Sequence, residues 1–318
     1  MSAVDASVRA LPARAEAAPP WKVWTALWIV YIVWGSTYLG IALMVETIPP
    51  LLGAGTRFVL VGLILLPILA WRKGLASIRP SRATLLSAGF VGVMLPGANA
   101  VLSIAQQTVP SGLAALLVAS IPLWVVLLRR VSGEQITGRG LVAVLVGFGG
   151  VALLVRPEGE ATLIGLLACL FAAFMWAVGS FASPRISLPR DPLVSTAWQS
   201  LLGGVVIVAA GLLKGEAPDV HFGEFSLRSV LGLAYLITFG SLLAFTCYAW
   251  LLQNAPISKV STYAYVNPVV AIALGWLILD EGISALTALG AGIIVASVAL
   301  VIRSESPGRR RGAAQPAQ

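Results

Sequence analysis

The stretch QTVPSGLAALLVASIPLWVVL, residues 107–127, decides the architecture of this chain. It is predicted to be an apolar helix that Pro122 interrupts near its middle, because a proline inside a helix removes a backbone hydrogen bond and kinks it. The stretch QNAPISKVSTYAYVNPVVAI, residues 253–272, repeats this pattern, again with two prolines, the second being Pro268. In lipid such a break survives only where protein or a watery cavity satisfies the freed backbone groups.

Two interrupted apolar segments at matching positions in two halves of a chain indicate the binding site of a transporter. The alternative is that the prolines only kink the helices and help them to pack.

The composition indicates a membrane protein. Of 318 residues, 58% are hydrophobic and 11% are charged, whereas a soluble domain carries about 25% charged residues. The net charge of +8 lies in short loops and tails, so it indicates membrane topology rather than a nucleic-acid partner. Cys169 and Cys247 lie in apolar runs and His221 is the single histidine. No metal or cofactor is therefore expected.

Ten segments are apolar and long enough to cross a membrane, which takes about 20 residues for a helix. They are Trp24–Met44, Leu51–Trp71, Thr84–Ile104, Gly112–Leu128, Arg139–Val155, Thr162–Ala182, Leu193–Leu213, Ser229–Leu252, Ser261–Leu279 and Ala285–Ile302. Residues 1–23 are predicted to form a disordered cytoplasmic tail, and residues 303–318 a basic cytoplasmic tail.

The lysines and arginines predict the orientation. With the N-terminus inside, the outer loops hold Arg156, Lys214 and Arg228, one more arginine lies inside a span, and all others of the 21 fall in inner segments. Cytoplasmic loops carry such an excess of positive charge. We therefore predict a multi-pass protein of the cytoplasmic (inner) membrane with both termini in the cytoplasm.

The two halves of the chain resemble each other. WGS at 34–36 corresponds to WAVGS at 176–180, and Gly62 corresponds to Gly204. Each half has five spans, and this odd number inserts the second copy upside down, as in the inverted repeats of many secondary transporters. The predicted repeats are residues 24–155 and 162–302.

Longer segments carry a family resemblance. The segment WGSTYLGIALMVETIPPLLGAGTRFVLVGLILLP at 34–67 resembles the start of an EamA-type repeat of the drug/metabolite transporter (DMT) superfamily. AQQTVPSGLAALLVASIPLW at 105–124 and APISKVSTYAYVNPVVAIALGWLILDEGIS at 255–284 resemble its later landmarks. The resemblance covers about 24–302. It implies an all-α polytopic membrane protein of ten helices in two inverted five-helix repeats, which moves small metabolites such as amino acids or amines, often outward.

Polar and aromatic side chains inside the spans are candidates for a substrate site, because a polar group that faces lipid costs free energy. The candidates are Ser36, Thr37, Tyr38, Asn99, Ser103, Trp124, Trp176, Tyr263 and Asn267, with Pro122 and Pro268 as kinks that serve gating. Trp124, Trp176 and Tyr263 are predicted to form an aromatic wall suited to flat or cationic ligands. Hydrogen bonding between helices is the alternative for the hydroxyls of residues 36–38, and core packing is the alternative for each ring.

Arg57 is the only charged residue well inside a predicted span. A functional arginine at membrane depth would contact an anion, since a guanidinium binds a carboxylate through two parallel hydrogen bonds. The sequence favours a structural role, in which the side chain extends to the outer interface or pairs with Glu46.

The sequence thus predicts a secondary transporter, an exporter of small metabolites that works by alternating access. An enzyme is not expected, since no HExxH, GxSxG or Walker motif is present. A membrane channel, a non-transporting receptor or scaffold, and an uptake carrier are the alternatives. The substrate, the coupling ion and the oligomeric state do not follow from the sequence.

Overall fold

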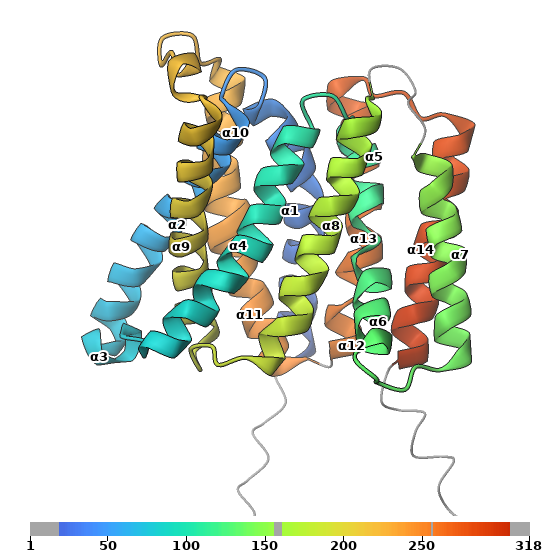
Figure 1. Ribbon diagram of the computed structural model, residues 1–318, viewed down its shortest axis with the longest axis horizontal. Helices are drawn as coiled ribbons and strands as arrows, with labels where there is room; N and C mark the ends of the chain where they lie inside the picture. The colour runs from blue at the N-terminus through green and yellow to red at the C-terminus, as the bar shows by residue number, and fades with distance from the viewer. Residues whose placement is uncertain (1–18, 156–160, 256, 306–318) are drawn as a thin grey trace, which may run out of the picture.

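The computed structural model describes residues 19–155, 161–255 and 257–305, and in these ranges it is a bundle of helices without strands (Figure 1). The first half contains α1 Pro20–Met44, α2 Pro50–Lys73, α3 Leu75–Ile78, α4 Arg82–Ala105, α5 Ser111–Val118, α6 Ile121–Val131 and α7 Gly138–Leu154. The second half contains α8 Leu163–Ala182, η1 Ser183–Arg185, α9 Pro192–Lys214, η2 Ala217–Asp219, α10 Leu227–Tyr235, η3 Leu236–Leu243, α11 Ala244–Asn254, α12 Ile257–Val260, α13 Tyr263–Leu279 and α14 Ala285–Glu305.

Eight helices are long and apolar enough to cross a membrane, with α5–α6 and α10–α11 each counted as one. The two other predicted spans correspond to α7 and α13, which are apolar but shorter, at 17 residues each. The predicted all-helical architecture is therefore confirmed for the described residues.

The first and last helices extend a few residues into the predicted tails. Helix α1 already starts at Pro20, since a proline is well suited to the first position of a helix. Helix α14 continues to Glu305. The rest of the predicted tails, residues 1–18 and 306–318, lies outside the described residues.

Side-chain caps explain where several helices begin. The hydroxyls of Ser81, Thr137 and Thr162 accept hydrogen bonds from backbone N–H groups in the first turns of α4, α7 and α8. The carboxylate of Asp191 does the same for two N–H groups of α9. These groups would otherwise lack partners at a helix start, so the caps fix the helix boundaries.

The interrupted segment breaks slightly before its proline. Helix α5 ends at Val118 and α6 starts at Ile121, which places Pro122 in the first turn of α6. Ser120 lies in the break, is fully buried, and donates to the carbonyl of Leu117 at 2.6 Å. In the second half the corresponding break separates α12 from α13, and Pro268 lies inside α13.

Corresponding spans of the two halves pack against each other. The second spans pair as α2 with α9, the fourth as α5 with α13, and the fifth as α7 with α14. Glycines permit the close approach of α2 and α9. A Cβ on Gly62 would lie 2.6 Å from the Cβ of Leu201, and one on Gly204 would lie 2.6 Å from the backbone nitrogen of Val59. The matched glycines of the two sequence halves thus both lie at this interface, each against the opposite helix.

Two carboxylates of the second half cap helices of the first half. Glu281 follows α13, and its two oxygens accept from the N–H groups of Ser111 and Gly112 at 2.6 and 2.9 Å. Glu216 follows α9 and is buried, and one of its oxygens accepts from Leu51 and Leu52, both at 3.0 Å. Because the N-terminus of a helix favours negative charge, these contacts tie the halves together at the starts of α5 and α2.

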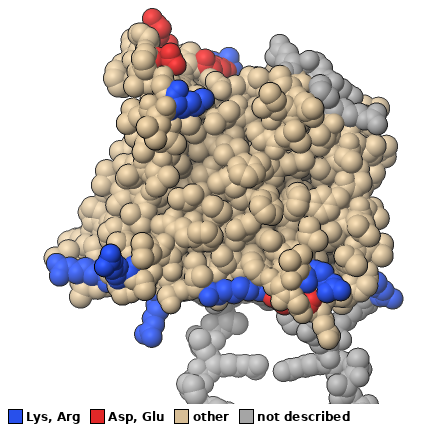
Figure 2. Space-filling view, viewed as in Figure 1, with Lys and Arg blue, Asp and Glu red and all other residues tan. Residues whose placement is uncertain are grey.

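The two ends of the bundle differ in charge. Figure 2 shows lysines and arginines gathered along the lower edge, where α3 and the end of α6 lie in Figure 1. On this face the acidic side chains lie mostly at the opposite end. Lysines and arginines that the sequence assigns to one side of the membrane thus gather at one end of the bundle.

Candidate functional site

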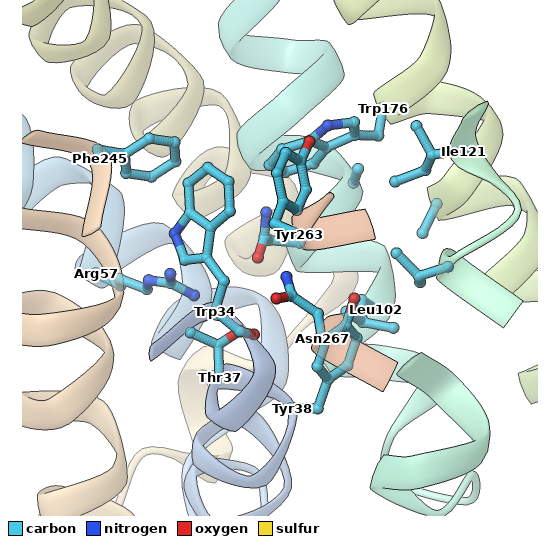
Figure 3. A pocket seen from close by; sticks show the side chains of 14 residues that line it. Trp34, Thr37, Tyr38, Arg57, Leu102, Ile121, Trp176, Phe245, Tyr263 and Asn267 are labelled. Carbon is cyan, nitrogen blue, oxygen red and sulfur yellow. The ribbon is translucent and has the colours of Figure 1, made fainter. Parts of the chain in front are cut away.

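A cavity of about 660 Å³, including the open volume at its mouth, lies between helices of the two halves (Figure 3). Its lining residues are Trp34, Thr37, Tyr38, Arg57, Ala98, Asn99, Leu102, Val118, Ile121, Ala172, Trp176, Phe245, Tyr263 and Asn267. They come from α1, α2, α4, α5 and α6 of the first half, and from α8, α11 and α13 of the second. This size and this mainly apolar lining are typical of a small-molecule site.

An aromatic cluster around Trp34 forms one wall of the cavity. The ring centroid of Trp34 lies 4.9 Å from that of Tyr248, 5.1 Å from that of Tyr263 and 5.3 Å from that of Phe245. Its indole N–H donates to the carbonyl of Gly240 at 3.2 Å. The Trp34 ring is therefore held by neighbours on several sides.

Arg57 faces the same cavity and is buried, with 4% of its surface exposed. Its Nε donates to Ser241 Oγ at 3.0 Å, and its guanidinium lies 4.8 Å from the ring centroid of Phe58. The sequence suggested that the Arg57 side chain extends to the outer interface. In the structure it points into the cavity instead. Glu46, the other predicted partner, lies 3.6 Å from Arg228 instead.

Some of the polar candidates line the cavity, and the others form hydrogen bonds away from it. Thr37, Tyr38, Asn99 and Asn267 line the cavity. Asn99 Nδ2 donates to the carbonyl of Leu95 at 3.2 Å, which leaves its oxygen for a ligand. In the amide orientation that satisfies both groups, Asn267 donates to the carbonyls of Tyr263 and Tyr31 at 3.2 Å.

Ser36 and Ser103 do not line the cavity. Ser36 Oγ is 2.5 Å from the hydroxyl of Tyr235, which realises the alternative of interhelical hydrogen bonding. Ser103 is 1% exposed and donates to the carbonyl of Asn99 at 2.9 Å, one helical turn away. The Ser36 hydroxyl therefore links α1 to α10, whereas the Ser103 hydroxyl is bonded within α4.

The predicted aromatic wall needs a correction. Trp176 and Tyr263 line the cavity, but Trp124 does not. The ring of Trp124 packs against Phe148 and Phe174, with centroids 4.7 and 5.4 Å apart, on the side of α6 that faces α7 and α8.

Trp34, rather than Trp124, contributes a tryptophan ring to the aromatic wall. A pattern in the sequence could have identified it. Trp34 and Trp176 occupy matching positions of the two halves, and both line the cavity. Phe245 was also missed, since no motif marks it.

Both proline kinks border a second, smaller cavity of about 340 Å³. It is lined by Pro122 and Pro268 and shares Tyr38, Tyr263 and Asn267 with the larger cavity. The interrupted helices thus adjoin the candidate site.

No carboxylate lines the larger cavity. Throughout the described part of the chain, no group of three His, Cys, Asp or Glu side chains is arranged to hold a metal ion. The polar chemistry of the cavity therefore consists of one guanidinium, hydroxyls, amides and indole N–H groups.

Comparison with known proteins shows which family and which relatives the chain is similar to. The profile of the EamA-like transporter family matches residues 22–156 and 163–303. The uncharacterized inner membrane transporter YedA of Escherichia coli K12 is 36% identical over 280 residues, which cover 87% of this chain and 89% of that protein. Protein PecM of Dickeya dadantii is 30% identical and covers 89% of this chain and 93% of its own length.

A second Escherichia coli protein, named a probable amino-acid metabolite efflux pump, is 28% identical, with 84% of this chain and 90% of that protein covered. A solved crystal structure shares the fold, with a TM-score of 0.62 and 20% identity over 90% of this chain and 98% of that chain.

Proposed function

The chain belongs to the EamA-like transporter family, and on this premise we propose that it is a secondary transporter that exports small metabolites across the cytoplasmic membrane. One observation supports this proposal above the others: helices of both halves enclose one cavity with a mixed aromatic and polar lining. A site at the interface of two repeats is accessible from alternate sides when the halves rock against each other.

We further propose ten membrane-spanning helices arranged as two inverted repeats, residues 24–155 and 162–302. The pairing of α2 with α9, α5 with α13 and α7 with α14 supports this arrangement. In two inverted repeats, a two-fold axis relates each helix of one half to the corresponding helix of the other, so counterparts near the axis pack together. The matched pairs Gly62 with Gly204 and Trp34 with Trp176 support it from the sequence.

The proposed orientation has both termini in the cytoplasm. The positively charged end of the bundle supports this (Figure 2). Outward transport of a metabolite is supported by the efflux function in the name of one relative, and the inner membrane by the name of another.

The proposed substrate contacts are Thr37, Tyr38, Asn99, Trp176, Tyr263 and Asn267, with Trp34 and Phe245 added from the cavity lining. Movement of the halves would occur at the breaks before Pro122 and Pro268, since both prolines border the smaller cavity.

An export experiment tests the function. Cells that overproduce the full chain are compared with cells carrying an empty vector, and the medium is profiled by mass spectrometry. We expect at least one small metabolite to be enriched by the wild type. Asn99→Ala removes a hydrogen-bonding group from the cavity, so we expect export to fall about three- to tenfold at equal membrane levels.

Asn254→Ala is the matched control, because Asn254 is an exposed asparagine that also donates to a carbonyl four residues earlier. Equal export by the two variants would contradict the site. Depletion of a compound from the medium would indicate an uptake carrier, flux without saturation a channel, and no flux of any compound a receptor or scaffold.

A further inference from the structure

Arg57 is a buried cation without a counter-charge. Among the residues that the structure describes, no carboxylate lies within ion-pair distance of its guanidinium, and only its Nε has a hydrogen-bond partner. A guanidinium carries five N–H groups, and burial of a charge is costly unless it is paired. Within the described ranges the two Nη groups therefore have no partner, and they are available to a ligand.

The surroundings of Arg57 hold its guanidinium in place. Ser241 accepts from Nε on one edge, and the ring of Phe58 lies along the side chain. Gly240 adjoins Nη2: a Cβ on this glycine would lie 3.3 Å from that nitrogen. These contacts come from α2 and η3, so both halves position the same group.

The segment that meets Arg57 has an unusual backbone. Gly240 and Ser241 lie in η3, a π-helical stretch within the span from α10 to α11. Single π-helical turns interrupt α-helices frequently at functional sites. Here the widened turn supplies the hydroxyl for Arg57 Nε and the carbonyl for the Trp34 indole.

Figure 3 shows where the guanidinium points. It extends from α2 toward Trp34, with Thr37 below it, and Tyr263 and Asn267 stand across the cavity. An anionic group at Arg57 would therefore be attached to a body that lies among aromatic and aliphatic side chains.

We infer that the cavity is a site for a monoanionic carboxylate with an apolar or aromatic body, and that Arg57 is the residue that selects for it. This inference rests on the proposed transport function and narrows its substrate class. The carboxylate accepts two parallel hydrogen bonds from the guanidinium, an arrangement that suits this pair of groups.

The charge count distinguishes this class from its rivals. One cation compensates one negative charge, whereas a phosphate ester carries about −1.5 to −2 at neutral pH. An amine finds no carboxylate in the cavity lining. In the second half the position that corresponds to Arg57 is Gln199, which donates to Ser195 at 2.7 Å and adds no second cation.

Binding to the purified full chain tests the inference separately from transport. Indole-3-propionate, tryptophan and tryptamine share one aromatic body and differ in charge, and 4-methylpentanoate, leucine and 3-methylbutylamine form a matching aliphatic series. A ligand raises the melting temperature of the protein that it binds. We expect the two carboxylates to stabilise the wild type most, and each amine least.

Arg57→Gln introduces the residue that stands at the corresponding position of the second half. We expect it to weaken carboxylate binding about 30-fold, in line with the loss of one partner of a buried charge pair, and to leave the amines unaffected. Gly240→Ala keeps the charge but displaces Nη2, so carboxylate binding should weaken there as well. This second variant carries the test if Arg57→Gln does not fold.

The inference is wrong if neither carboxylate binds, if the carboxylates bind no more tightly than the amines, or if both variants leave the order of affinities unchanged. Equal stabilisation by chloride and by the carboxylates would also overturn it, since it would indicate a site for any small anion. A protein that binds carboxylates but transports no solute in vesicles would refute the transport function and leave this binding site intact.

Discussion

The contact of Glu281 with the start of α5 should control how easily one end of the bundle opens. Glu281→Gln removes the negative charge but retains one neutral acceptor. In the wild type, the two carboxylate oxygens of Glu281 accept from the N–H groups of Ser111 and Gly112 at 2.6 and 2.9 Å. Hydrogen bonds to a charged group contribute about 1.5–3 kcal/mol. A loss of roughly 2 kcal/mol would raise the open population about 30-fold.

Thiol labelling measures this population. Ala115 on α5 is fully buried and lines the smaller cavity, so Ala115→Cys is labelled by a membrane-impermeant maleimide when this end opens. The two native cysteines, Cys169 and Cys247, are first replaced by alanine. When opening and closing are fast relative to labelling, the rate follows the open population.

We expect Glu281→Gln to raise the labelling rate about 30-fold over the parent. Glu224→Gln is the control, since Glu224 is exposed and lies in the loop between η2 and α10 at the same end. If both variants are labelled at rates within about twofold of the parent, the contact does not restrain opening, and the reasoning from its hydrogen bonds is refuted.

Two further predictions concern stability. Gly204→Ala places a Cβ 2.6 Å from the backbone nitrogen of Val59, so we expect it to lower the Tm in detergent through an overpacking cost of about 1–3 kcal/mol. Gly149→Ala, whose Cβ would meet nothing within 4 Å, should not lower it, and equal melting temperatures would contradict the close packing of α2 on α9. Hydrogen bonds, above all from Arg129, hold the pKa of Glu134 below its usual 4.5. Since the folded pKa is the lower one, this contact stabilises the fold above pH 4.5 and is lost as the pH falls through the folded pKa. The Tm difference between wild type and Glu134→Gln should therefore narrow below pH 4.5, and a difference that stays constant in acid would argue against the contact.

The sequence predicted the helices well because apolar length and prolines act locally. Helix α2, for example, begins at Pro50, one residue before the predicted span Leu51–Trp71. The matched glycines Gly62 and Gly204 were also informative, because only a residue without a side chain permits the close approach of the opposite helix at each position. Local patterns thus describe which segments form helices and where two of them meet.

The site was harder to predict, because it depends on how each helix is rotated. The break at Ser120 resets the rotation of α6 relative to α5 and turns Trp124 toward Phe148. Arg57 meets Ser241, which lies 184 residues further along the chain and in a π-helical turn that no sequence pattern marks. Long-range contacts of this kind do not follow from spacing within one segment.

Flux through the cavity is the most direct test of the account. The full chain is reconstituted into vesicles with the exported compound, in a variant with Cys169 and Cys247 replaced by alanine and Thr37→Cys introduced in the cavity lining. We expect flux that saturates with concentration and stops after alkylation, while a variant with Ser77→Cys, at an exposed site on α3, continues to transport. Flux that does not saturate, or that continues after Thr37→Cys is alkylated, would contradict a carrier that moves its substrate through this cavity.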